Sequence, residues 1–321
     1  MSDRWKDVTL FGNVKNKLKI VNSFGNIVVH KTVDMERFQR NKVADGGICP
    51  FAALVNEIEI LQTHCQGNIR FPIIELGTRT VPCPILIIKV FGKPGISDLR
   101  DVYSHFYEKS ESGIVKFEER SRYLIFQELA YAVKFLHDKK IAHCDIKPEN
   151  ILINENWSTE DEYFVFDSDQ VAKTAPIIKL IDFACAVTEK KGEEGVYTNQ
   201  INTLPYSAPE LLDPDSSTPV SAIACDIWNC GIILHLLLIG PICFHFDANG
   251  EVEFGWDHFC DRFPNLPHLF TEMKNNIESM YSNIKRNNVG GGYETILLKT
   301  LARTPEKRPD MSQILHLLNN N

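Results

Sequence analysis

The amino-acid sequence predicts an α+β protein with two lobes, a small lobe formed by an antiparallel β-sheet with one main helix and a larger, mostly α-helical lobe. Short β-rich runs separated by glycine and asparagine come first, and long segments with helical periodicity follow Gly95. The chain has 321 residues, of which 44% are hydrophobic and 24% charged. This composition allows a large buried core, and we expect one globular domain over 1–321.

The small lobe is expected over 1–90. Runs rich in β-branched and aromatic residues predict its strands, at 8–11, 18–21, 26–33 and 85–91. Residues 51–64 carry apolar side chains at helical spacing and predict an amphipathic helix. The larger lobe is expected over 91–321, after a short hinge at about 89–94. Its helices are predicted at 118–139, 225–239 and 311–318.

Two stretches have the composition of surface insertions. Residues 34–50 are rich in charge and glycine, and residues 154–175 are acidic. The region 244–292 contains Trp256 and three consecutive glycines at its end. The acidic insertion and this region either recognise a partner or elaborate the surface, and the second interpretation is the simpler one.

Charge and hydropathy exclude several classes of function. The net charge of −8 predicts no broad basic surface, so nucleic acid is not expected as a partner. The longest apolar run, 232–239, is far shorter than the roughly 20 residues of a membrane-spanning helix. The first residues resemble neither a signal peptide nor a myristoylation site, which predicts an intracellular protein of the cytoplasm or nucleus. The nine cysteines include no C-x-x-C pair and are expected to be reduced core thiols.

The segment 143–153, HCDIKPENILI, carries the strongest chemical signal. It places Asp145, Lys147 and Asn150 just before an apolar strand, at the spacing used in phosphoryl transfer. The segment resembles the catalytic loop of eukaryotic protein kinases. The resemblance implies that Asp145 accepts or orients the hydroxyl proton of the substrate, that Lys147 neutralises charge on the phosphoryl group, and that Asn150 binds Mg²⁺. It also implies that Leu152 contacts the nucleotide.

Later motifs follow the order of the same family. IKLIDFA at 178–184 resembles the magnesium-binding D-F-G, which implies that Asp182 holds the metal. TLPYSAPE at 203–210 resembles the end of an activation segment, with Thr203 on the substrate platform. The resemblance also implies three structural residues, namely Glu210 paired with Arg308, and Asp226 bracing the catalytic loop.

In the small lobe, Lys31 resembles the lysine that contacts the α- and β-phosphates, and Glu57 its partner on a helix. Without the downstream motifs, either residue would equally suit a solvated surface position. The nucleotide pocket is further expected to include Val29, Ile88 and Lys89. The resemblance extends from Val8 to Leu318. It also implies an apolar stack of three side chains, Leu61, His143 and Phe183.

Several positions depart from the family pattern. Residues 11–17 keep a single glycine of the phosphate loop, Gly12, and Val29 stands where a small alanine is usual, so weaker nucleotide binding is expected. Ala184 replaces a glycine and is expected to restrict the backbone after Asp182. Cys144 replaces the arginine that holds a phosphorylated activation loop. Phosphorylation of the activation-loop residues Thr188, Tyr197 and Thr198 is therefore expected to change the activity little.

These residues support three hypotheses. The first is a serine/threonine kinase that uses ATP with Mg²⁺, or Mn²⁺, on a protein substrate; Lys147 and Thr203 favour this type over a tyrosine kinase. The second is a pseudokinase that regulates a protein partner, which the altered phosphate loop favours. The third is a small-molecule kinase, which the peptide-platform segment 203–210 disfavours. The sequence does not indicate an oligomeric state.

Overall fold

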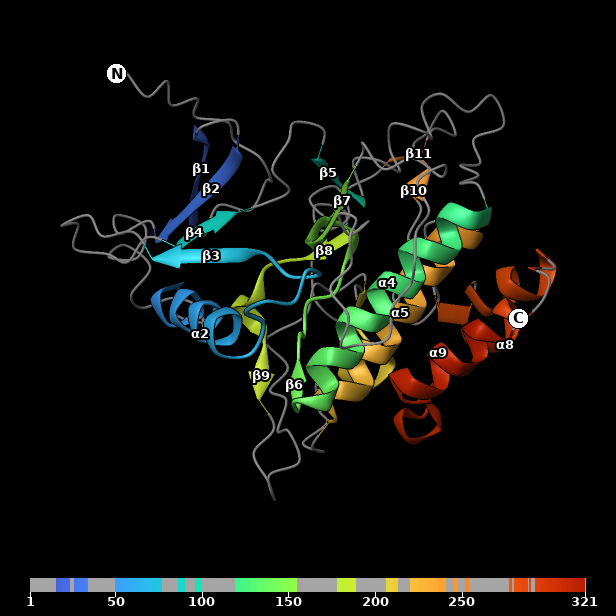
Figure 1. Ribbon diagram of the computed structural model, residues 1–321. Helices are drawn as coiled ribbons and strands as arrows, with labels where there is room; N and C mark the ends of the chain where they lie inside the picture. Colours follow the sequence, from blue (N-terminus) through green and yellow to red (C-terminus); the bar gives the residue numbers. More distant parts are fainter. Residues whose placement is uncertain are drawn as a thin grey trace. The chain divides into compact units, whose positions relative to one another are not determined.

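The computed structural model describes the following residues: 16–23, 26–33, 50–76, 86–89, 96–99, 119–154, 178–188, 206–212, 220–240, 245–246, 252–253, 277–278, 280–287, 289 and 292–320. They belong to two compact units (Figure 1). The first takes its residues from 1–102 and 149–186, and the second from 103–148 and 187–321. The lobes at 1–90 and 91–321, with their hinge, stay predictions.

The first unit contains a four-stranded antiparallel sheet in the order β1-β2-β4-β3. Its strands are β1 (Asn16–Ser23), β2 (Asn26–Val33), β3 (Ile73–Leu76) and β4 (Leu86–Lys89). In the register of β2 and β4, Val29 pairs with Ile88 and Lys31 pairs with Leu86. Four positions of the predicted nucleotide pocket, Val29, Lys31, Ile88 and Lys89, therefore lie on two neighbouring strands.

Helix α2 (Pro50–Thr63) follows the sheet's first two strands in sequence and lies one residue earlier than predicted. Its buried positions include Leu54, Glu57 and Leu61, which recur every three to four residues and form one face. Glu57 is fully buried, at 0% exposure, within this otherwise apolar face. A carboxylate at such a position requires a partner, because an unpaired buried charge is strongly unfavourable.

A second, three-stranded antiparallel sheet in the order β5-β7-β8 completes the first unit. It is formed by β5 (Ile96–Asp98), β7 (Ile151–Asn154) and β8 (Ile178–Leu180). Ile151 pairs with Leu180, so the residue before β7 and the residue after β8 are neighbours. A short 3₁₀ turn, η2 (Phe183–Cys185), follows β8. Another, η1 (Pro148–Asn150), precedes β7.

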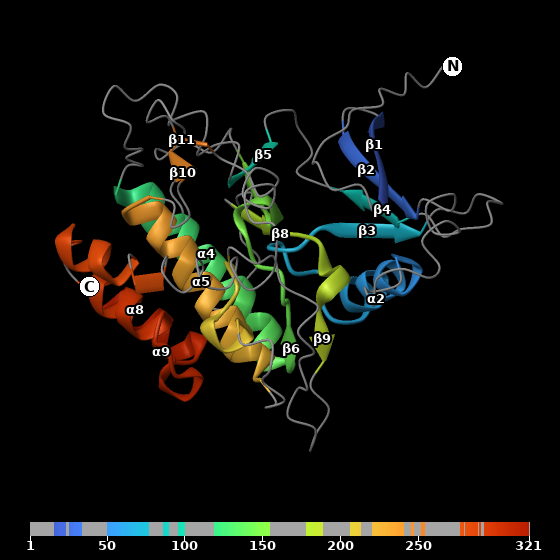
Figure 2. The ribbon, with the colours of Figure 1, turned by 180° about the vertical axis from the view of Figure 1, so that it is seen from behind.

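The second unit is mainly helical. Its helices are α4 (Glu119–Asp138), α5 (Ala222–Leu238), α8 (Tyr293–Thr300) and α9 (Met311–Asn319). Helix α5 begins where the Ser221 side chain accepts a hydrogen bond from the N–H of Ala224, and almost all of its residues are buried. Helices α4 and α5 lie side by side in both views (Figures 1 and 2). The apolar run at 232–239 forms the C-terminal half of this buried helix and ends with Ile239 just after it.

Short elements also belong to the described part of this unit. They are the antiparallel pairs β6 (Ile141–Ala142) with β9 (Val187–Thr188) and β10 (His245–Phe246) with β11 (Val252–Glu253), and the turns η4 (Pro209–Leu211) and η5 (Pro305–Lys307). Gly231 of α5 faces the end of α8, because a Cβ added there would lie 2.7 Å from the side chains of Thr300 and Leu301. The glycine therefore permits the close approach of these two helices.

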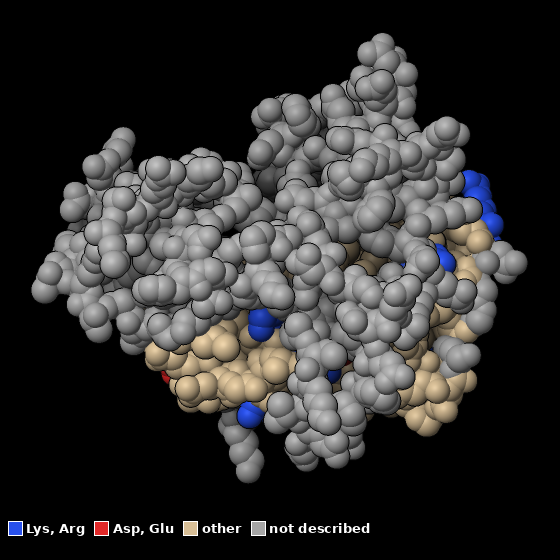
Figure 3. Space-filling view, turned by 45° about the horizontal axis from the view of Figure 1, so that its top comes forward, with Lys and Arg blue, Asp and Glu red and all other residues tan. Residues whose placement is uncertain are grey.

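Three further findings concern the described residues as a set. None of their helices is long and apolar enough to cross a membrane. Their five cysteines are all buried except the half-buried Cys185. On the face in Figure 3, the described Lys and Arg side chains lie at separate places.

Candidate active site

The buried carboxylate of Glu57 is paired with Lys31. Strand β2 presents the Lys31 side chain, which is 6% exposed. Its Nζ lies 2.6 Å from Glu57 Oε2 and 2.7 Å from Asp182 Oδ1. A strand, a helix and the second residue after β8 thus bring one cation to two carboxylates, within hydrogen-bond distance. The three residues, far apart in the sequence, form one polar cluster of the first unit.

The electrostatics of the cluster keep the lysine charged. Burial alone would lower the pKa of Lys31, but the carboxylates of Glu57 and Asp182 raise it well above its ordinary value. Burial raises the pKa of the Glu57 carboxyl, and the ammonium of Lys31 opposes that rise. Lys31 therefore stays protonated, and a charged ammonium is the form of lysine that binds phosphate oxygens.

Asp182 has an unusual backbone. Its φ of 66° and ψ of 76° lie in the left-handed region, which is unfavourable for a residue with a Cβ. Ala184 was expected to be the restricted position, yet among the described residues 181–188 only Asp182 has a positive φ. Ala184 instead sits within the 3₁₀ turn η2. The strain therefore falls on the residue whose carboxylate contacts Lys31.

Asn150 lies directly before β7, and Asp182 lies two residues after β8, the strand that pairs with β7. The N–H of Ile181 donates to the carbonyl of Asn150 at 3.0 Å, and Asn150 is buried. Amide and carboxylate oxygens are hard ligands that suit Mg²⁺, which keeps waters or substrate oxygens in its other positions. Among the described residues no three His, Cys, Asp or Glu gather as a metal cluster. The residues thus fit a Mg²⁺ ion shared with a nucleotide, and not an all-protein cage.

The predicted catalytic pair lies in the second unit. Lys147 Nζ donates to Asp145 Oδ2 at 2.8 Å. Both side chains are partly buried, and the backbone N–H of Asp145 also lies 3.3 Å from His143 Nδ1. The pair follows strand β6 in the loop that leads to η1. The adjacent ammonium holds the Asp145 carboxylate in place and offsets its negative charge.

Asp226 holds the backbone of this loop from helix α5. Its Oδ2 accepts from the N–H of His143 at 2.7 Å, and its Oδ1 accepts from the N–H of Cys144 at 2.8 Å. The His137 ring nitrogen Nε2 lies 3.1 Å from the same Oδ2. Asp226 is fully buried, so these three contacts satisfy a charge that has no access to solvent.

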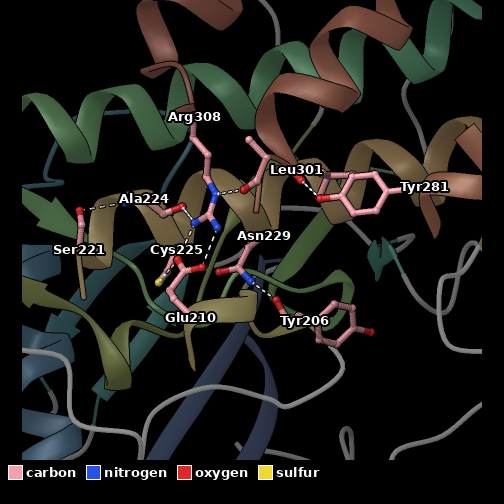
Figure 4. A network of polar contacts seen from close by, with 10 residues as sticks. Tyr206, Glu210, Ser221, Ala224, Cys225, Asn229, Tyr281, Leu301 and Arg308 are labelled. Atoms are coloured by element: carbon pink, nitrogen blue, oxygen red, sulfur yellow. Dashed lines mark hydrogen bonds and ion pairs between the residues drawn. The ribbon is translucent and has the colours of Figure 1, made fainter. Parts of the chain in front are cut away.

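Glu210 and Arg308 form a bidentate ion pair (Figure 4). The guanidinium donates to both carboxylate oxygens of Glu210, at 2.6 and 2.7 Å, and to the carbonyl of Ala224 at 2.9 Å. Its centre lies 5.1 Å from the centroid of the Trp228 ring. The Cys225 thiol also contacts Glu210, and burial raises the pKa of that thiol. The ion pair joins η4, α5 and the residue after η5.

For the other predicted residues, the structure gives burial or strand pairing, or does not describe them. Leu152 is buried on β7, and Lys89 on β4 pairs with Val28 and Ile73. Leu61, His143 and Phe183 are all buried. Several predicted features lie outside the described residues, namely Thr203, Gly12, Tyr197, Thr198, most of both predicted insertions and the hinge. Thr188 is exposed on β9.

Some residues around the cluster were not predicted. The Phe71 ring lies 5.8 Å from the Phe183 ring in an edge-to-face arrangement. Asn56, next to Glu57, and Lys179, three residues before Asp182, both bind backbone carbonyls. The only sequence signal for the last two was their position beside a predicted site residue. Phe71 had no signal, because it lies in a loop without periodicity.

The order of these polar residues along the chain and the two antiparallel sheets are typical of a protein of the kinase class. A family model described as the protein kinase domain matches residues 11–318, so the chain belongs to the protein kinase family. This confirms the predicted family, whose members are ATP-binding transferases, and implies the bilobal kinase fold.

Curated relatives carry serine/threonine kinase names. The chain is 34% identical over 185 residues to a ribosomal protein S6 kinase alpha-2 of Caenorhabditis elegans, covering 50% of this chain and 22% of that protein. It is 28% identical over 221 residues to CBL-interacting serine/threonine-protein kinase 12 of Arabidopsis thaliana, covering 68% of this chain and 37% of the relative. The chain therefore spans less than half the length of these relatives.

Proposed function

We propose that the chain is an active protein kinase that transfers the γ-phosphoryl group of ATP to a serine or threonine hydroxyl of a protein. The observation that carries the proposal is the contact of Lys31 with both Glu57 and Asp182. Such a buried cluster of charges is unfavourable in itself, so it favours a role in binding over one in stability. The serine/threonine kinase relatives support the class of acceptor.

Each polar residue has a role in this proposal. Mg-ATP supplies the phosphoryl group and a metal that offsets its negative charge. Lys31 binds the α- and β-phosphates, and Glu57 keeps its ammonium in place. Asp182 and Asn150 hold the metal through their side-chain oxygens. With Mg-ATP bound, the Asp182 carboxylate would hold the metal, and phosphate oxygens would take its place beside Lys31.

Asp145 and Lys147 act on the acceptor side. Asp145 orients the substrate hydroxyl and accepts its proton, while the hydroxyl oxygen bonds to the γ-phosphorus. The bond from that phosphorus to the bridging oxygen of ADP breaks, and ADP leaves with both electrons of the bond. Lys147 stays beside Asp145 at hydrogen-bond distance and neutralises charge on the transferring group.

A radiolabel assay tests this function. The purified protein is incubated with γ-labelled ATP, Mg²⁺ or Mn²⁺, and a mixed protein substrate, beside the variants Asp145→Asn and Asp182→Asn. We expect label on protein with the wild type and a loss of at least ~100-fold in both variants. If none of the three folded proteins transferred label, the result would contradict the proposal. Label found on a metabolite and never on protein would instead indicate a small-molecule kinase.

A pseudokinase is the second candidate, and the phosphate loop favours it. Residues 11–17 keep only Gly12, and side chains there hinder the approach of backbone N–H groups to phosphate. A thermal-shift titration with Mg-ATP separates the candidates in part, because a ligand stabilises the native state by RT ln(1 + [L]/Kd). No shift at millimolar Mg-ATP would favour a protein that acts through a regulated partner.

A further inference from the structure

Helix α2 and the Asp182 segment are joined by a contact that does not involve Lys31. Asn56 precedes Glu57 on α2 and is half-buried. Its Nδ2 donates to the carbonyl of Ala186 at 2.8 Å and to the carbonyl of Phe183 at 3.2 Å. These carbonyls stand at the start of η2 and just after its end. One amide group therefore spans the whole turn that follows Asp182.

A second connection fixes the other side of Asp182. Lys179 of β8 is buried, and its Nζ donates to the carbonyls of Ile69 and Phe71 at 2.8 and 3.0 Å. The N–H of Leu180 donates to the carbonyl of Arg70 at 3.0 Å. All three carbonyls belong to the loop between α2 and β3. Asp182 thus lies between two anchoring points, one on helix α2 and one on the loop that follows it.

Asp182 needs such restraint. Its left-handed backbone is a strained state, and strain of this kind persists only where surrounding contacts determine the conformation. The Lys31 contact restrains the Asp182 side chain, but the two carbonyls held by Asn56 restrain the backbone itself. Because Asn56 is adjacent to Glu57, a shift of α2 would displace both contacts together.

We propose that Asn56 is a positioning residue, whose side-chain amide holds the Asp182 turn against helix α2 so that Glu57 and Asp182 reach Lys31 together. The chemistry requires an amide, because two carbonyl oxygens face a single nitrogen that can donate to each. A carboxylate of the same shape has no proton to donate at neutral pH, and an apolar side chain leaves both carbonyls without this donor. The contact adds no charge to the turn.

The catalytic part of the test rests on the proposed function. Asn56→Asp keeps the shape of the side chain and removes both donors, and Asn56→Gln keeps the amide on a longer side chain. We expect Asn56→Asp to lower kcat roughly tenfold and to raise the KM for ATP, with an unchanged KM for the protein substrate. Asn56→Gln should recover part of the kcat. Gln62→Glu adds the same charge at an exposed position of the same helix and should match the wild type.

Hydrogen exchange tests the same inference without catalysis. In Asn56→Asp, the amides of residues 183–188 should exchange at least ~10-fold faster than in the wild type, whereas those of helix α5 should not change. Gln62→Glu should leave both regions unchanged. Unaltered exchange at 183–188 in Asn56→Asp would overturn the proposal, as would faster exchange with a wild-type kcat. If the wild type itself transfers no phosphate, the proposed function fails and exchange alone decides the role of Asn56.

Discussion

Asp226 holds Cys144 in a left-handed backbone conformation. The N–H of Cys144 donates to Asp226 Oδ1 at 2.8 Å, and the φ of Cys144 is 68°. A residue with a Cβ reaches this φ only at an energetic expense, which a buried charge-assisted hydrogen bond can offset. The contact fixes the backbone of the residue before Asp145 and so helps to set the position of the predicted catalytic carboxylate.

The substitution Asp226→Asn should therefore destabilise the protein. The new side chain would turn its N–H₂ group toward a backbone N–H, which then lacks an acceptor. Because this site is buried, we expect the free energy of unfolding to fall by about 2–3 kcal/mol. Urea denaturation measures this change. Asp138→Asn removes an exposed carboxylate at the end of α4 and should change the free energy by less than ~0.5 kcal/mol. Equal effects of the two substitutions would contradict the role given to Asp226.

The Glu210–Arg308 ion pair should contribute more to stability than an exposed pair. Arg308→Met leaves the Glu210 carboxylate without its bidentate partner and is expected to lower the free energy of unfolding by about 3–5 kcal/mol. Arg303 pairs with Glu278 at the surface, where both side chains are more than half exposed. Arg303→Met is therefore the control, with an expected change below ~1 kcal/mol. Similar losses for the two variants in urea denaturation would refute this distinction.

Lys179 should give the stability a pH dependence. Burial lowers the pKa of Lys179 to about 8, below its ordinary value of 10.5, so the folded protein releases this proton at lower pH than the unfolded chain. Stability then rises with pH above about 8, because the unfolded state binds more protons there. Relative to Lys179→Met, the wild type should gain about 1 kcal/mol between pH 7 and pH 9. Parallel pH profiles of the two proteins would exclude this shift.

Long periodic segments were predictable because their pattern depends on local sequence alone. The helix expected at 118–139 is α4 at Glu119–Asp138, and the one expected at 311–318 is α9 at Met311–Asn319. The helix expected at 225–239 begins earlier, at Ala222, because Ser221 caps it. A cap depends on one side chain and lies outside the apolar pattern on which the prediction relied.

Contacts between distant residues were less predictable. Asn56 binds carbonyls more than 100 residues later in the chain, and no period in the sequence signals such a contact. The position of the backbone strain was also missed. The replaced glycine directed attention to Ala184, whereas the structure puts the positive φ on Asp182. The charged cluster itself was expected only through the family resemblance, because a lysine on a strand and a glutamate on a helix are common.

The central claim is that the cluster of Lys31, Glu57 and Asp182 serves phosphoryl transfer. The most direct measurement is single-turnover transfer from γ-labelled Mg-ATP to protein. The wild type is compared with Lys31→Met and with Lys134→Met, which changes a half-buried lysine of α4 that pairs with Asp138. The account predicts transfer by the wild type and by Lys134→Met, and a loss of at least ~100-fold in Lys31→Met. Transfer by Lys31→Met at the wild-type rate, or none by the folded wild type, would contradict it.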